Sequence, residues 1–126
     1  MGQLTIEHKE THEDQIAKNA PYTSLFRECL VEAQKIAASD IHIEPRREQG
    51  NVRFRIDGAM HQVYEIPANI TAAVVSRIKI MGRLDVAEKR KPQDGRIKTR
   101  SPEGAEIELR LSSMPTAFGE KLVLRI

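Results

Sequence analysis

Alternation between apolar and polar residues constrains the fold of this chain more than any other feature. Two runs alternate strictly, one with Ile41 and Ile43 as its apolar members and one with Val52, Phe54 and Ile56. A period of two places the apolar side chains on one face of a β-strand and the charged side chains on the other. Short strands of this kind that follow one another along the chain form antiparallel sheets with one packed face and one solvated face.

Turn signals divide the rest of the pattern into further strands. We expect Gly50-Asn51 and Asp57-Gly58 to form the turns of the first hairpins, and residues 101–104 to form the turn between two later strands. Asp94-Gly95 is expected to turn the chain into the next strand, with Gly95 at a positive φ. Six strands result, at about residues 41–44, 52–56, 60–66, 96–100, 106–112 and 121–126.

Two segments show the three- and four-residue spacing of an amphipathic helix. The first begins at Pro21, with Thr23 or Ser24 as its N-cap, and its apolar stripe consists of Tyr22, Leu25, Phe26, Cys29, Leu30, Ala33, Ile36 and Ala37. The second starts around Ile70 and ends near Gly82. The order of helix, three strands, helix and three strands predicts an α+β fold, in which two helices pack on an antiparallel sheet of about six strands.

Length and composition favour a single domain. The chain has 126 residues, which is close to the usual size of one domain. Residues 1–20 lack the helical periodicity, so we expect them to be a linker or tail before one domain at residues 21–126. The single cysteine, Cys29, lies in the apolar stripe and indicates a buried thiol in a reducing compartment. Without a signal-peptide pattern or an apolar run of about 20 residues, the chain is expected to be cytoplasmic.

The net charge of +2 conceals a basic stretch. Residues 77–100 contain nine Lys or Arg residues against three Asp or Glu residues, and their middle part, residues 83–94, is expected to form an ordered loop. Such a stretch attracts phosphate of any origin, and a solvated basic face without a ligand is an equal alternative. The stretch contains no aromatic residue that could stack on a base, so nucleic-acid binding is not expected.

Patterns for metal binding and covalent catalysis are weak. His42-x-Glu44 matches the start of the zinc deaminase signature, but the later cysteine pair is missing. A site that combines His42 with Asp40 and Asp57 lacks the fixed spacing of metal ligands, so we expect no metal. No serine stands in a nucleophile elbow and Cys29 lies on an apolar face, so a free-standing hydrolase is not expected.

Four segments, taken in order, resemble the second N-terminal domain of the ATPases of type II secretion and type IV pilus assembly. They read ASDIHIEP at residues 38–45, RFRIDG at 53–58, EKRKPQDGR at 88–96 and LRLSSMPTAFGEKLVLRI at 109–126. The resemblance covers residues 21–126 and implies a PAS-like domain of a hexameric motor. The phosphate-binding motif of such motors, GxxxxGK[ST], does not occur in these 126 residues, so we expect the chain alone to hydrolyse no ATP.

The resemblance also implies roles for individual residues. Arg110 and Arg125 are expected to contact the terminal phosphates of ATP, which the motor domain binds together with Mg²⁺. Apart from the resemblance, we expect the segment at residues 89–96 to be an ordered interface element in which Arg96 hydrogen-bonds acidic neighbours. The expected hallmark residues of the fold and its interfaces are Asp40, His42, Glu44, Asp57, Gly58, Arg90, Asp94, Gly95 and Arg96.

The resemblance further implies a set of partners. These are the C-terminal ATPase domains of the same and neighbouring subunits, and platform proteins that hold the motor at the inner membrane without direct insertion. Two alternatives stay open from the residues themselves, a phosphate- or nucleic-acid-binding module and a PAS-type ligand sensor.

Overall fold

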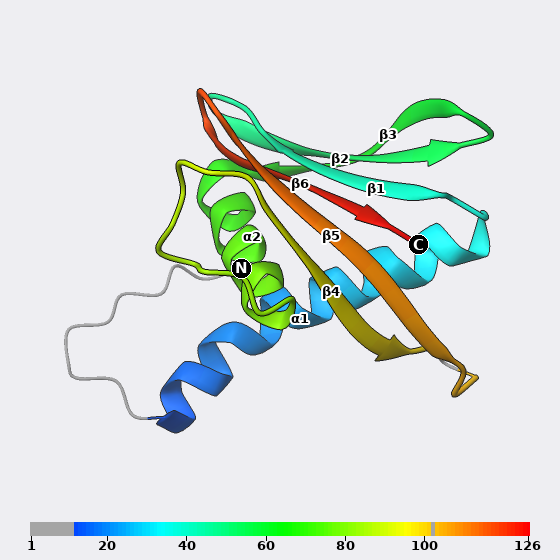
Figure 1. Ribbon diagram of the computed structural model, residues 1–126, viewed down its shortest axis with the longest axis horizontal. Helices are drawn as coiled ribbons and strands as arrows, with labels where there is room; N and C mark the ends of the chain where they lie inside the picture. Colours follow the sequence, from blue (N-terminus) through cyan, green and yellow to red (C-terminus); the bar gives the residue numbers. More distant parts are fainter. Residues whose placement is uncertain (1–11, 102) are drawn as a thin grey trace.

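The computed structural model describes residues 12–101 and 103–126 (Figure 1). Side chains are described from Pro21 onward. Its elements are α1 (His12–Lys35), β1 (Asp40–Pro45), β2 (Gln49–Ile56), β3 (Ala59–Pro67), α2 (Ala68–Met81), β4 (Gln93–Arg100), β5 (Glu106–Thr116) and β6 (Gly119–Arg125). This order of two helices and six strands confirms the α+β fold that the sequence predicts.

The six strands form one antiparallel sheet with the order β3-β2-β1-β6-β5-β4. The sheet consists of two meanders, β1 to β3 and β4 to β6, which join where β1 pairs with β6. At this junction Asp40 lies opposite Arg125, and Ile43 lies opposite Leu122. The junction therefore places the start of the first meander beside the end of the second.

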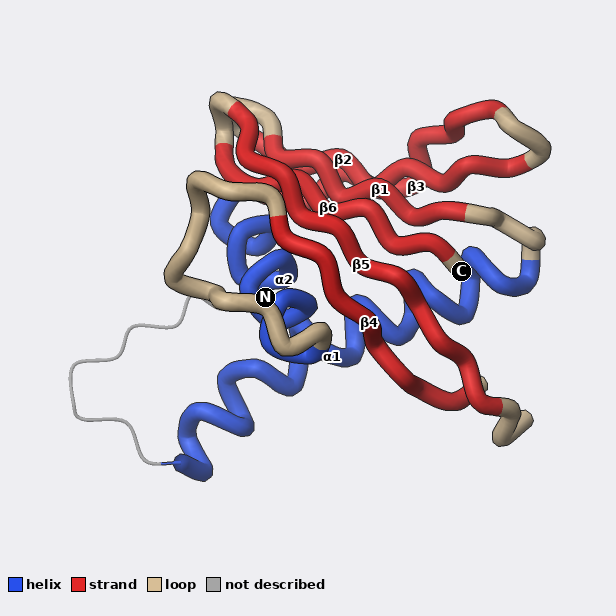
Figure 2. Tube along the Cα trace, in the orientation of Figure 1, coloured by secondary structure: helices blue, strands red, loops and turns tan. Residues whose placement is uncertain are grey.

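Both helices lie on one face of the sheet (Figure 2). The core forms between them from side chains that include Phe26, Leu30, Ala33, Ile41, Phe54, Ile78, Leu109, Leu111, Leu122 and Leu124. Full burial of one such Leu, Ile or Phe side chain contributes about 1.5–3 kcal/mol to stability. No element in the described part of the chain covers the opposite face, so the residues that alternate with the core lie there.

Helix α1 begins at His12, so the predicted start at Pro21 is wrong. Pro21 lies inside the helix, and Thr23 and Ser24 follow it there instead of capping the N-terminus. The first turns of α1 extend past the sheet in Figure 1, where no apolar stripe is needed, and the periodicity therefore gives no sign of them. The division of the chain after residue 20 stays a prediction, and residues 1–11 lie outside the described part.

The turn between β1 and β2 differs from the prediction. Gly50 and Asn51 lie within β2. The turn is formed instead by residues 46–49, where the Arg46 N–H donates to the Gln49 carbonyl at 2.7 Å. Position 50 requires glycine because a Cβ there would overlap the side chain of Thr71 on α2. The turn at Asp57-Gly58 forms as predicted, with φ values of 51° and 81°.

The predicted turn at Asp94-Gly95 is also wrong, since both residues lie within β4 and Gly95 has no positive φ. Close packing explains the glycine instead. A Cβ on Gly95 would lie 2.6 Å from the carbonyl oxygen of Gly82 and 2.8 Å from Cδ2 of Leu84. The hairpin turn between β4 and β5 forms as predicted, and there the Gly104 N–H donates to the Ser101 carbonyl at 2.9 Å.

Candidate phosphate-binding face of the sheet

The uncovered face of the sheet carries a row of mostly charged side chains, one from each strand. From β3 to β4 the strand register aligns Met60, Arg55, Asp40, Arg125, Arg110 and Arg96, which we call the arginine row. Core residues flank the row along the strands, as Ile41 does next to Asp40 and Leu111 does next to Arg110. Alternation in the sequence is therefore enough to predict which side of the sheet these arginines occupy.

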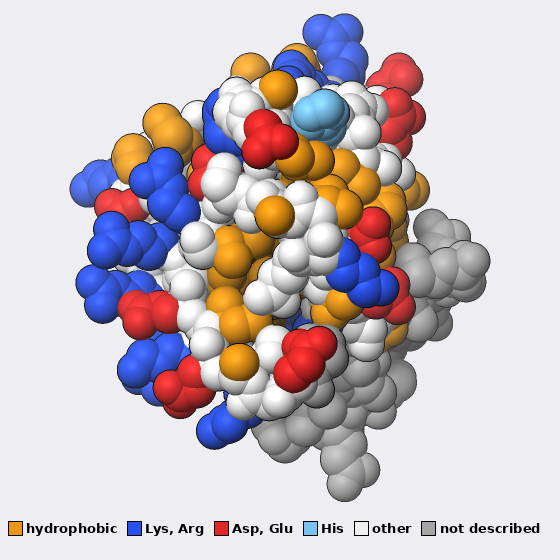
Figure 3. Space-filling model, turned by 90° about the vertical axis from the view of Figure 1, so that its right-hand side faces the viewer, with side chains coloured by type: hydrophobic (Ala, Val, Ile, Leu, Met, Phe, Trp, Pro, Cys, Tyr) orange, Lys and Arg blue, Asp and Glu red, His pale blue; other side chains and the backbone are white. Residues whose placement is uncertain are grey.

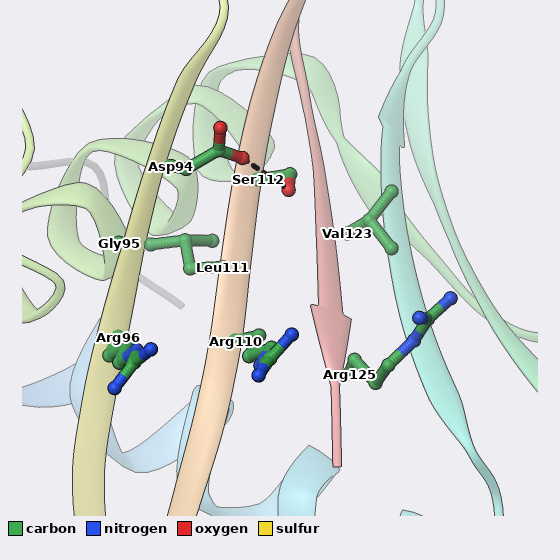
Figure 4. A pocket seen from close by; sticks show the side chains of 8 residues that line it. All are labelled: Asp94, Gly95, Arg96, Arg110, Leu111, Ser112, Val123 and Arg125. Carbon is green, nitrogen blue, oxygen red and sulfur yellow. Dashed lines mark hydrogen bonds between the residues drawn. The ribbon is translucent and has the colours of Figure 1, made fainter.

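Three of these arginines border a hollow of about 480 Å³. It is lined by Asp94, Gly95, Arg96, Arg110, Leu111, Ser112, Val123 and Arg125. Figure 4 shows Arg96 and Arg110 side by side on neighbouring strands, whereas the side chain of Arg125 turns away from them toward β1. The Ser112 hydroxyl donates to Asp94 Oδ1 at 2.7 Å across the upper part of the hollow.

The arginines of the row differ in what holds them. Arg125 Nε lies 3.3 Å from Asp40 Oδ1, and Arg55 Nε lies 3.4 Å from the other carboxylate oxygen of Asp40. Arg96 pairs with Glu108 at 3.2 Å, which confirms the expected bond to an acidic neighbour. Arg110 is exposed, and among the described residues its guanidinium has no hydrogen-bond or ion-pair partner. A free guanidinium presents a planar fork of donors that matches the oxygens of a phosphate group.

Two further predicted residues, His42 and Glu44, lie on the same face. Glu44 pairs with Arg53 at 3.2 Å. Burial lowers the pKa of His42, and the nearby charge of Lys121 lowers it further, which together outweigh the opposite effect of the Asp40 and Glu44 carboxylates on this pKa. Its Nε2 lies 4.0 Å from Asp40 Oδ2, and within the part of the chain that the structure describes it has no hydrogen-bond partner.

The candidate metal ligands do not converge. Asp57 lies on the exposed turn between β2 and β3, whereas Asp40 and His42 lie within β1. Between residues 12 and 126, leaving out residue 102, no three His, Cys, Asp or Glu side chains are placed to hold a metal ion. The same stretch contains no helix that is long and apolar enough to cross a membrane.

The basic stretch of the sequence does not form one surface. Lys79 is fully buried, and Arg77 Nε donates to Thr23 Oγ1 on α1 at 2.9 Å. Arg96 belongs to the arginine row, while Arg90 is 90% exposed on the loop before β4. Figure 3 shows Lys and Arg side chains along the side that faces the viewer in Figure 1, with acidic side chains between them. A local excess of basic residues in the sequence therefore becomes a mixed surface in the fold.

A buried ion pair between Lys79 and Glu120 is absent from the sequence predictions. Lys79 Nζ lies 2.9 and 2.8 Å from the two carboxylate oxygens of Glu120 and donates to the carbonyl of Glu88 at 2.9 Å. This contact ties α2, the loop before β4 and the start of β6 together. Helical spacing offered a signal, because Lys79 follows the buried Thr71 and Val75 at steps of four residues.

The sequence matches a known protein family over most of its length. Residues 15–126 match the family described as type II/IV secretion system protein, and the chain belongs to that family. It is 72% identical over 89 residues to the type IV pilus assembly ATPase TfpB of Acinetobacter baylyi, an alignment that covers 71% of this chain and 15% of that protein.

Two other relatives extend the similarity over most of the chain. The type II secretion system protein E of Xanthomonas campestris is 48% identical, with 88% of this chain and 19% of that protein covered. The type IV pilus assembly ATPase PilB of Pseudomonas aeruginosa is 42% identical, with 94% and 21% covered. The chain thus spans about a fifth or less of the length of these relatives.

Proposed function

We propose that this domain completes the ATP site of a motor domain in the full-length protein. Arg110 and Arg125 supply positive charge to the terminal phosphates of ATP, which the motor domain of the same or a neighbouring subunit holds with Mg²⁺. The relatives support this proposal because they are named as assembly ATPases, or as the E protein of the secretion system. The domain itself hydrolyses nothing in this account.

The observation that carries the proposal is the direct pairing of Arg110 with Arg125 across β5 and β6 beside the hollow. Like charges directly opposite each other destabilise a sheet, and within the described part of the chain the guanidinium of Arg110 makes no hydrogen bond or ion pair that would stabilise the fold. An anion bound at the hollow, which both residues line, offsets the positive charge that they bring to this face. A phosphate group suits the position because it accepts several charge-assisted hydrogen bonds at once.

A phosphate contacted by two domains couples the nucleotide state to their relative position. While ATP is bound, the arginines hold this domain against the motor domain. Hydrolysis and phosphate release remove the shared anion, and the domain is free to rotate as a rigid body. In a hexameric ring at the inner membrane, this rotation passes to the neighbouring subunit and on to the secretion or pilus platform.

ATP turnover of the full-length protein tests the proposal. Arg110→Ala and Arg125→Ala should each lower turnover by roughly 10²–10³-fold, the loss seen when one donor to transition-state charge is removed. Lysine at either position should recover part of the activity, because it keeps the charge and loses the fork. Lys98→Ala is the control, because Lys98 lies on the same face of β4 outside the arginine row. Equal turnover in all of these variants would remove the arginines from the ATP site.

A further inference from the structure

We infer that Asp40 is a positioning residue for Arg125, which its carboxylate holds by Nε so that the two terminal nitrogens stay free for phosphate. The inference rests on the proposed function and adds a residue to it. It joins the segment around Asp40 to the last strand, although the two are 85 residues apart in the sequence.

The Nε atom and the terminal nitrogens of the Arg125 side chain have different surroundings. The Nε atom lies 3.3 Å from Asp40 Oδ1, yet the side chain as a whole is 71% exposed. The contact at Nε limits the directions that the guanidinium can take, and among the described residues its terminal NH₂ groups have no hydrogen-bond or ion-pair partner. A side chain that is ordered before it meets its ligand loses less conformational freedom on binding.

Asp40 is itself held firmly. It is 5% exposed, and its backbone lies between β2 and β6, opposite Arg55 on one side and Arg125 on the other. Arg55 contacts the second oxygen of the Asp40 carboxylate and donates from Nη1 to the carbonyl of Gly58 at 3.0 Å. A continuous chain of contacts therefore runs from the turn at Gly58 through Arg55 and Asp40 to Arg125, which lines the hollow.

The ion pair between Arg125 and Asp40 contributes little to the stability of the fold. An ion pair with so exposed a partner is weak, and without Arg125 the Asp40 carboxylate keeps Arg55 as its counter-ion. Arg110, in contrast, has no such support among the described residues. The two arginines therefore differ, one aligned in advance and one free to follow the phosphate.

A double-mutant cycle in the full-length protein tests the inference. Asp40→Asn keeps the shape of the side chain and removes its charge, and turnover at saturating ATP should fall roughly tenfold, within the range that misplacement of a catalytic group costs. In an Arg125→Ala background the same substitution should cause no further loss, because nothing remains to be positioned. Glu65→Gln is the control, since it removes a carboxylate charge from the same sheet at a residue of β3 outside the arginine row, where Glu65 accepts a hydrogen bond from Gln62, and turnover should stay unchanged.

The outcomes separate the inference from the proposed function. If Arg125→Ala itself leaves turnover unchanged, the proposed function fails. If Arg125→Ala is impaired while Asp40→Asn is not, only the positioning role fails. A loss from Asp40→Asn that persists in full in the Arg125→Ala background would show a general structural role and overturn the inference.

A second variant keeps the test decisive if Asp40→Asn does not assemble. Arg55→Gln removes the anchor of Asp40 at a side chain that is 38% exposed. We expect a smaller fall in turnover that again disappears in the Arg125→Ala background. No fall, or a fall that is independent of Arg125, would overturn the inference.

Discussion

Replacement of Lys79 by methionine should destabilise the fold by about 3–5 kcal/mol, because it leaves the carboxylate of Glu120 buried without a counter-ion. Lys79 is fully buried and Glu120 is 8% exposed, so water cannot replace the lost contact. The carbonyl of Glu88, the third partner of Lys79 Nζ, keeps a hydrogen bond of 3.1 Å from Gln93 Nε2. The expected cost therefore arises almost entirely from the unpaired carboxylate.

Removal of both charges should have a much smaller effect. Lys79→Met combined with Glu120→Leu replaces the pair by apolar side chains of similar volume, and such a replacement is often neutral or stabilising by about 1–4 kcal/mol. We expect the free energy of unfolding of the double variant to be higher than that of the original chain, or lower by no more than about 1 kcal/mol. Glu120→Leu alone should lower the free energy of unfolding as much as Lys79→Met does, since it leaves the buried ammonium group of Lys79 without a counter-ion.

Urea unfolding followed by circular dichroism measures these differences. For a domain of this size a loss of 3–5 kcal/mol corresponds to a fall in Tm of roughly 10–20 °C. The reasoning is refuted if Lys79→Met costs less than about 1 kcal/mol, or if the double variant loses about the sum of the two single losses. Either result would mean that water or a rearranged loop reaches this site.

Two other predictions concern groups inside the fold. Gly95→Ala should lower the free energy of unfolding by about 1–3 kcal/mol, because its Cβ lies too close to the Gly82 carbonyl; a loss below about 0.5 kcal/mol in urea unfolding would contradict this packing argument. Burial raises the pKa of the Cys29 thiol from 9.0 to about 12, so the folded state favours the neutral thiol, and this contribution to stability should be lost as pH rises from 9.0 through 12. At pH 8 a thiol reagent should accordingly modify Cys29 far more slowly in the folded chain than in urea, and equal rates would show that the thiol is accessible.

Local patterns in the sequence predict much of this fold. The alternation around Ile41 and Phe54 identifies strands and their two faces, because the side-chain period of a strand is fixed by its geometry. The same argument places Arg110 and Arg125 on the uncovered face. Gly58 is likewise predicted, since the positive φ of a tight hairpin turn is a local requirement.

Features that depend on approach between distant elements escape such reasoning. Gly50 and Gly95 resemble turn residues in sequence, yet Thr71 and Gly82, which come from elsewhere in the fold, are what require them. The same holds for the contact of Asp40 with Arg125, which depends on the pairing of β1 with β6. The alternation within a single strand does not indicate which strands pair, because the register between β1 and β6 depends on how the two meanders meet in the folded chain.

The most direct test of the central claim is ATP turnover by the full-length Arg110→Ala, Arg125→Ala double variant in assembled hexamers, measured beside Lys98→Ala. We predict that the double variant assembles and binds ATP but turns it over at less than about one hundredth of the control rate, because both arginines that we propose as donors to the phosphate are absent. Turnover equal to that of Lys98→Ala in an intact hexamer would contradict the account and leave this domain without a part in the ATP site.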